Sequence, residues 1–199
     1  MQSRQMEHGQ NNKRVIFLDR DGVINRLIVE RGPRETPCTV DDLELLPRVV
    51  EAMSSLRKVG FDLVIVTNQP NIAKGKSTIQ DYEDINCRLK ELLGREAAVL
   101  DTYACTHHPD SDQVVVPELL QECSCRKPEP GLFLQAIKQH QIDVNSSWMV
   151  GDAKTDIEAG ERAGVPTNHL LFIGSPYSEH IRAVNDLFEA SQLILTLER

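Results

Sequence analysis

Residues 15–25 read VIFLDRDGVIN, four apolar residues followed by two aspartates that a single arginine separates. An uninterrupted apolar run of this kind is typical of a strand with both faces covered, as in a parallel sheet. Asp19 and Asp21 then stand at the carboxyl end of the strand, where open α/β sheets bind their ligands. This stretch predicts the fold class and the location of the site together.

The rest of the chain alternates between strand-like and helix-like patterns. Runs of the same apolar character are expected as strands at 63–66, 99–104, 148–150 and 170–173. Segments whose apolar residues recur every three or four positions are expected as helices at 48–59, 78–93, 130–140, 154–163 and 179–190. This alternation predicts a three-layer, doubly wound α/β sandwich with a mainly parallel, Rossmann-like sheet.

Length and charge narrow the class of protein. With 199 residues, 40% of them apolar, the chain is long enough for one domain with a buried core. Its net charge of −8 disfavours nucleic acid and membrane surfaces as partners, since both require basic patches. No apolar run approaches the roughly 20 residues of a membrane span, and no signal peptide is evident. We expect a disordered tail over 1–13, one cytoplasmic domain over 14–199 and, because no apolar helix face is left over, a monomer.

Three polar residues come at or just after the ends of predicted strands, namely Asp19, Thr67 and Asp152. Each alone is often only a turn former or a helix cap. Together they are expected to meet at one edge of the sheet. The nearby carboxylates of Asp19 and Asp21 repel each other unless a cation offsets them, and Mg²⁺ favours carboxylates together with substrate phosphate.

A second constellation lies in the loop 105–125, where C-x-H is followed after 15 residues by C-x-C. The five cysteines are an odd number in a chain without an export signal, which disfavours a disulfide framework. Four sulfur and nitrogen ligands suit tetrahedral Zn²⁺ in a structural site; the alternative is free thiols beside a surface histidine. The ligands are expected to be Cys105, His107, Cys123 and Cys125, with His108 bonded nearby or facing solvent.

The order of four motifs resembles the haloacid dehalogenase-like superfamily of aspartate-nucleophile phosphotransferases. The motifs are D-x-D-G at 19–22, VTNQ at 66–69, RKP at 126–128 and VGDAKTD at 150–156. The resemblance covers residues 14–173 and implies a magnesium-dependent enzyme acting on a small phosphorylated metabolite. A second aspartate in the first motif accompanies phosphatase activity in the superfamily, so Asp21 favours phosphate hydrolysis.

The resemblance also implies a role for each motif residue. Asp19 is the expected nucleophile, which forms an aspartyl-phosphate, and Asp21 the expected acid and base. Magnesium is expected on the side chains of Asp19 and Asp152 and on the main chain of Asp21. Thr67 and Lys127 are expected to bind the phosphoryl oxygens.

Four further residues in or near the motifs are candidates for the site. Asn68 is expected to touch substrate, although an asparagine after a strand is as often a turn former, and Asn25 to line the pocket. Asp156 is expected to cap its helix, where the dipole favours a carboxylate, and a contribution from it or Lys154 to the site stays open.

The zinc loop and the following RKP resemble a narrower subgroup, small members without a large cap domain. This subgroup contains heptose-bisphosphate phosphatases and histidinol-phosphate phosphatases, and in it Arg126 helps to recognise substrate. Two departures concern the substrate: segment 26–46 lacks a His-Gly-Tyr-type motif, and Ala153 stands where the heptose enzymes have lysine. We expect a heptose bisphosphate substrate, with histidinol phosphate or another small phosphometabolite as the alternative. A zinc-stabilised binding protein without activity is the alternative of another class.

Charge matching favours the bisphosphate, because its second phosphate needs a cation of its own whereas histidinol phosphate needs carboxylates. The cations available near the pocket mouth are expected to be Arg26, Arg31, Arg34, Lys74, Lys76 and Arg126. Arginine binds two phosphate oxygens at once. Segment 26–46 also holds five acidic residues, and such a mixture is often only a solvated surface loop.

Overall fold

The computed structural model describes residues 13–28, 35–176 and 178–198. The expected tail lies outside this range except for Lys13, whose backbone N–H donates to Gln141 O at 3.2 Å. Arg31 and Arg34 also lie outside the described residues. Within the described part, no helix is long and apolar enough to cross a membrane.

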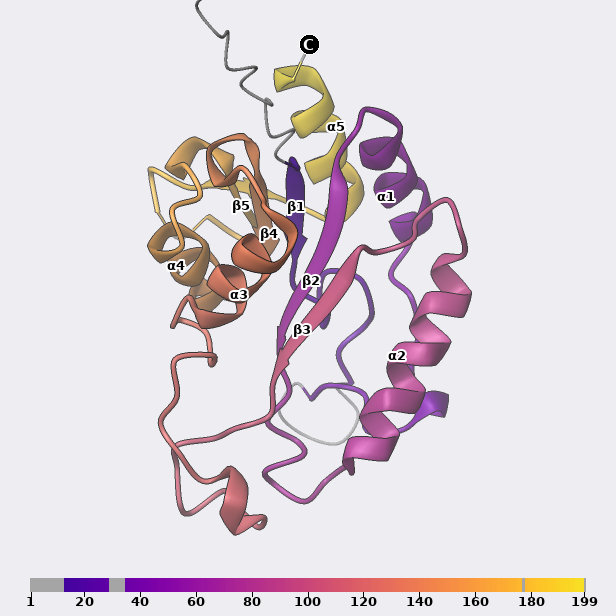
Figure 1. The fold of residues 1–199 in the computed structure, drawn as a ribbon. Coiled ribbons are helices and arrows are strands. Elements are labelled where there is room, and N and C mark those ends of the chain that lie inside the picture. The colour runs from indigo at the N-terminus through magenta and orange to yellow at the C-terminus, as the bar shows by residue number, and fades with distance from the viewer. Residues whose placement is uncertain (1–12, 29–34, 177, 199) are drawn as a thin grey trace, which may run out of the picture.

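Six parallel strands form one sheet at the centre of the fold (Figure 1). Their bounds are β1 Val15–Leu18, β2 Asp62–Asn68, β3 Asp101–Cys105, β4 Trp148–Gly151, β5 Leu170–Ile173 and β6 Arg182–Val184. The spatial order is β3-β2-β1-β4-β5-β6, so the chain first builds outward from β1 on one side and then returns to build on the other.

Helices cover both faces of the sheet, which confirms the three-layer sandwich. Their bounds are α1 Val49–Lys58, α2 Ile79–Leu93, α3 Gly131–His140, α4 Lys154–Arg162 and α5 Leu187–Leu197. Buried residues of α1, α2 and α5 pack with one face of β1 and β2, whereas α3 and α4 pack with the other. The two helix layers lie on opposite sides of the strands in Figure 1.

The strand order places the site. β1 pairs with both β2 and β4, with Leu18 beside Ile65 and Val150. The order reverses at β1, and ligands of open α/β folds bind beyond the strand ends at such a switch point. Asp19 and Asp152 both leave the sheet there.

One expected helix is wrong, the one at 179–190. Arg182–Val184 instead form β6, which pairs in parallel with β5, and the helix begins at Leu187. The reason is a capping residue inside the expected span: Asp186 accepts the N–H of Glu189 at 2.8 Å, so the helix starts after it. The third strand also differs slightly, since it runs over Asp101–Cys105 and not from residue 99.

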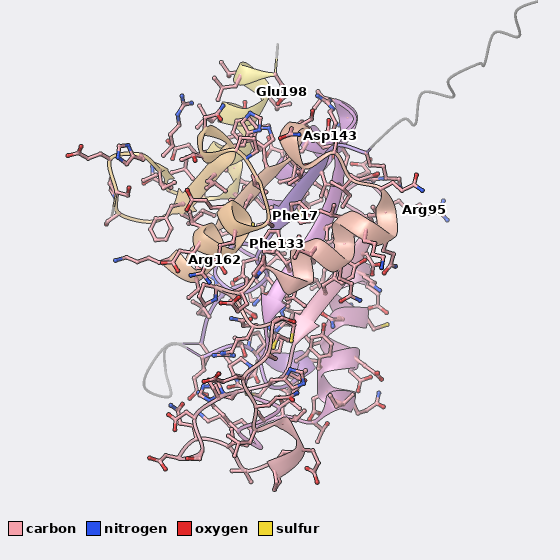
Figure 2. The ribbon with its side chains drawn as sticks, turned by 60° about the vertical axis from the view of Figure 1, so that its left-hand side comes forward. Phe17, Arg95, Phe133, Asp143, Arg162 and Glu198 are labelled. Carbon is pink, nitrogen blue, oxygen red and sulfur yellow. The ribbon has the colours of Figure 1, made fainter. Side chains whose placement is uncertain are left out.

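The core beneath α3 depends on a pair of aromatic rings. Phe17 of β1 and Phe133 of α3 are fully buried, and their ring centroids lie 4.9 Å apart. Figure 2 labels both near the centre of the molecule. Leu134, the next residue, is 49% exposed.

Phe133→Ala should therefore lower the free energy of unfolding by about 3–5 kcal/mol, because it removes buried surface and leaves a cavity. Leu134→Ala is the matched control and should change it by less than about 0.5 kcal/mol. Urea unfolding followed by circular dichroism measures both. Equal effects of the two substitutions would contradict the packing described for α3.

Candidate active site

The residues at the carboxyl ends of β1, β2 and β4 form the rim of the candidate site, and Lys127 lies at its centre. Its Nζ donates to Asp19 Oδ1 at 2.7 Å and to Val66 O at 2.8 Å, and it forms an ion pair with Asp156 Oδ1 at 2.6 Å. The three donors of the ammonium group thus have three acceptors, although only 3% of the residue is exposed. Burial lowers the pKa of Lys127, but Asp156 and Asp19 outweigh it and raise the pKa, so the side chain stays charged.

The carboxylates around Lys127 are crowded. Oxygens of Asp19, Asp152 and Asp156 all lie within 4.8 Å of one another. Burial raises the pKa of Asp19 to about 8, against the opposing effect of Lys127. Burial and the charge of Asp156 raise the pKa of Asp152 to about 6. These raised pKa values mean that Lys127 alone does not compensate the ionised carboxylates, and an all-oxygen donor set that a further cation would stabilise fits Mg²⁺.

Gly22 allows the loop after β1 to close over this cluster. Its φ is +92°, and a Cβ on it would lie 2.1 Å from Asp152 Oδ2. Any side chain would therefore displace the carboxylate that follows β4. The glycine of the D-x-D-G motif thus has a steric reason in this fold.

Asp156 has two functions in the structure. Its Oδ2 accepts the N–H of Ala153 at 2.9 Å, which confirms the expected helix cap. Its Oδ1 binds Lys127. The carboxylate of Asp156, which caps α4 with one oxygen, therefore also belongs to the site through its other oxygen. In the sequence it stands four positions after Asp152.

Thr67 and Asn68 end β2 beside Lys127. Both backbone groups of Lys127 bond to the amide of Asn68, with its N–H to Oδ1 at 3.1 Å and its C=O to Nδ2 at 3.1 Å. The side chain of Asn68 thus fixes the main chain of Lys127. Thr67 is buried and accepts from Gln69 Nε2 at 2.9 Å.

Two buried residues that the motifs did not single out surround Asp21. Arg20 is fully buried and contacts both Asp21 oxygens, and Gln69 Nε2 donates to Oδ2 at 2.6 Å. Asn25, expected in the pocket, donates to Asp21 Oδ1 at 2.9 Å, and its own Oδ1 has no partner in the described part of the chain. Arg20 carried a signal in the sequence, a charged residue at the end of an apolar strand.

The sulfur-rich cluster assembles as expected. Cys105, His107, Cys123 and Cys125 converge, with neighbouring ligand atoms 3.1–3.7 Å apart. The longer spacings, 3.6 and 3.7 Å, match the edges of a tetrahedron with zinc bonds, about 3.6–3.8 Å, and all of them are too long for a disulfide. His107 faces the cluster through Nδ1, whereas Nδ1 of His108 accepts from Asp110 N–H. The four donors fit structural Zn²⁺.

The zinc loop holds several parts of the rim. Arg126 Nη1 donates to His107 O at 3.2 Å, and Gly131 N–H to Ser124 O at 2.8 Å. The N–H groups of residues 115 and 116 both donate to Ala73 O, at 2.9 and 3.1 Å. A metal in the cluster would therefore fix both the RKP motif and the loop after β2.

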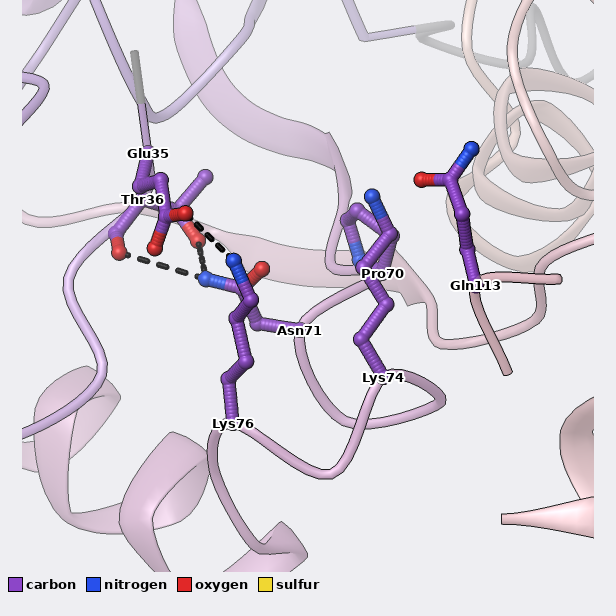
Figure 3. Close-up of a pocket in the computed structure, with 7 residues that line it drawn as sticks. All are labelled: Glu35, Thr36, Pro70, Asn71, Lys74, Lys76 and Gln113. Carbon is purple, nitrogen blue, oxygen red and sulfur yellow. Dashed lines mark hydrogen bonds and ion pairs between the residues drawn. The ribbon is translucent and has the colours of Figure 1, made fainter. Parts of the chain in front are cut away.

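A cavity of about 400 Å³ lies beside the loop that follows β2 (Figure 3). Dashed lines in Figure 3 join Lys76 to Glu35 and Asn71 to Thr36, and none reaches Lys74. Burial lowers the pKa of Lys74, and the charges of Lys76 and Arg126 lower it further. Arg26, in contrast, forms an exposed ion pair with Glu44 at 2.8 Å.

Aspartates around a buried lysine, at the switch point of an open α/β sheet, are suited to the transfer of a phosphoryl group. The family model of haloacid dehalogenase-like hydrolases matches residues 28–164, and the chain belongs to this family.

Two relatives and one solved structure narrow the comparison. The chain is 38% identical over 193 residues, 95% of its length and 100% of the relative, to D-glycero-alpha-D-manno-heptose-1,7-bisphosphate 7-phosphatase of Photorhabdus laumondii. It is 41% identical over 163 residues, 81% of each chain, to the beta-anomer 7-phosphatase of Escherichia coli K12. Its fold is similar to the crystal structure of D,D-heptose 1,7-bisphosphate phosphatase from B. bronchiseptica complexed with magnesium and phosphate, with a TM-score of 0.75, 23% identity and coverage of 92% and 99%.

The cluster geometry predicts one zinc per chain. Cys125→Ser and His107→Ala should lower the zinc content well below one, because each removes a ligand. Cys87→Ser, an exposed thiol on α2, and His108→Ala are the matched controls and should retain the metal. Elemental analysis after dialysis measures the ratio. Zinc loss on His108→Ala together with retention on His107→Ala would show that the wrong histidine is assigned.

Proposed function

We propose that this chain is a magnesium-dependent phosphomonoesterase that removes the 7-phosphate of D-glycero-D-manno-heptose 1,7-bisphosphate. The observation that carries the proposal is the position of Lys127, 2.7 Å from Asp19 on the rim after β1. There the ammonium group of Lys127 contacts the carboxylate of Asp19, which follows the end of β1. The names of the relatives support the substrate.

The chemistry assigned to the chain's own residues has two steps. A carboxylate oxygen of Asp19 attacks phosphorus, the bond to the sugar oxygen breaks, and Asp21 gives that oxygen a proton. Water then attacks the phosphorus of the aspartyl-phosphate, Asp21 takes its proton, and the bond to Asp19 breaks. Lys127 and the Thr67 hydroxyl bind the phosphoryl oxygens during both displacements.

Asp19 and Asp152, with the main chain of Asp21, would hold Mg²⁺. When bound, the ion supplies positive charge to the transferring phosphoryl group. The Lys127 ammonium donates to the Asp19 carboxylate and to Val66 O of the sheet. The carboxylate of Asp19 is therefore screened enough to approach an anionic ester.

The second phosphate of the substrate is assigned to the cations of the loops. Lys74 forms no ion pair with an acidic residue among those that the structure describes, and it borders the cavity of Figure 3. Arg126 lies near enough to lower the pKa of Lys74. Arg126 and Lys127 also line a common cavity of about 580 Å³. Arg126 is thus close enough to Lys74 to act on its charge and shares a cavity with Lys127, so the second phosphate has cations apart from the phosphoryl-binding lysine.

A phosphate-release panel tests the function directly. With magnesium present, both anomers of the heptose bisphosphate should give a higher kcat/KM than histidinol phosphate or simple monophosphates. Asp19→Asn should lower turnover more than about 10³-fold while leaving the melting temperature close to that of the native chain. Higher kcat/KM on histidinol phosphate would favour that substrate, and no release from any ester would favour a binding protein.

Lys74→Gln adds a test of the distal subsite. It should raise KM for the bisphosphate about tenfold and leave KM for a monophosphate within about twofold, since one charge-assisted contact is lost. Lys138→Gln, an exposed lysine on α3, is the charge-matched control and should change neither. Equal rises in both KM values after Lys74→Gln would contradict the subsite.

Three further expectations stay predictions: the single domain over 14–199, the monomeric state and the cytoplasmic location. Light scattering of the purified chain measures the second.

A further inference from the structure

Arg20 is a buried charge that the mechanism above does not use. It is among the largest side chains with no exposed surface, and a buried guanidinium is unfavourable unless it is paired and hydrogen-bonded. Its partner is the carboxylate of Asp21: Nε lies 3.3 Å from both oxygens and Nη2 3.1 Å from Oδ2. The pair fills the space between β1 and α2, where Nη1 also donates to Asn86 Oδ1 at 3.3 Å.

Gln69 closes a ring with this pair. Its Oε1 accepts from Arg20 Nη2 at 2.8 Å, and its Nε2 donates to Asp21 Oδ2 at 2.6 Å. Its backbone N–H is held by Cys105 O at 2.7 Å, so the side chain starts from a fixed point beside the zinc cluster. Each of the three side chains therefore bonds to the other two, and only 3% of Gln69 is exposed.

The two aspartates of the first motif are thus paired with different cations. Asp19 binds Lys127, which comes from the zinc loop, and Asp21 binds Arg20, its own neighbour in the chain. The arginine has no hydrogen bond or ion pair with Asp19 among the contacts of the described residues. Asp21 receives donors on both oxygens, so rotation of its carboxylate would break several hydrogen bonds at once.

We propose that Arg20 and Gln69 are positioning residues that hold the Asp21 carboxyl group in the orientation required for proton transfer to the leaving oxygen. The proposal rests on the proposed function, in which Asp21 is the acid. Misplacement of a catalytic group by about 1 Å can cost about 10²-fold in rate, and two buried partners prevent it here. Neither residue needs to touch the substrate.

Leaving-group dependence distinguishes this role from a purely structural one. A series of substituted phenyl phosphates keeps the shape of the ester nearly constant while the basicity of the leaving oxygen changes. General acid catalysis matters most for the more basic phenoxides and least for p-nitrophenoxide. The value of kcat/KM reports the step in which that oxygen leaves.

Gln69→Met should lower kcat/KM about tenfold or more for phenyl phosphate and less than about threefold for p-nitrophenyl phosphate. Arg20→Lys keeps the charge, loses the planar fork and should show the same pattern, which covers the case that the first variant does not fold. Asp21→Asn is the reference and should show the steepest dependence. Ser191→Ala, in which a buried residue of α5 loses its hydrogen bond to Phe188 O, should leave the slope unchanged.

A uniform loss across the series, or no loss, in both Gln69→Met and Arg20→Lys would overturn the proposal. If Asp21→Asn still gave a steep dependence in that case, the phosphatase mechanism would stand without these positioning residues. A flat response of Asp21→Asn would instead remove Asp21 as the acid, and inactivity of the native chain on all esters would remove the proposed function itself.

Discussion

The contact between Lys127 Nζ and Asp19 is the interaction on which the site depends. The two residues are 108 positions apart, and both are buried. Removing the cation of such a pair leaves an uncompensated charge and costs about 3–5 kcal/mol, whereas without the Asp19 charge Lys127 keeps its ion pair with Asp156. Several contacts from other parts of the fold keep Lys127 in place beside Asp19. Asn68 fixes the main chain of Lys127, Val66 accepts from its ammonium group, and the cap of α4 supplies a second carboxylate through Asp156.

The loop that delivers Lys127 has little secondary structure of its own. Between β3 and α3 the chain forms only the short helix Pro117–Leu119, and closing so long a loop is entropically unfavourable. The Cys105, His107, Cys123 and Cys125 cluster ties the start of the loop to its end. Because the same loop bonds to Ala73 and Arg126 bonds to His107, a structural metal would position groups of both the proposed phosphoryl subsite and the proposed distal subsite.

Much of the fold and of the ligand clusters could be predicted from the sequence, because apolar runs and motif spacing are local signals. The strands before Asp19 and Asp152 and the set of cysteine and histidine residues are examples. What the sequence analysis missed depends on pairing across the fold. β6 is only three residues long and stands beside β5, so its pattern resembled the start of a helix. Gln69 meets Arg20 and Asp21 only when β1 and β2 lie side by side, and Asp156 contacts Lys127 only when α4 packs near residues 126–128.

Removal and replacement of the Lys127 ammonium group test this account most directly. Lys127→Ala should lower kcat about 10²-fold or more, the scale of losing one preorganised charge donor, while the zinc content stays at one per chain. Ethylammonium in the assay should restore part of the lost turnover, because it can enter the space left by the side chain. Full turnover of Lys127→Ala without added amine would contradict the account, as would a loss of turnover that follows only the loss of zinc.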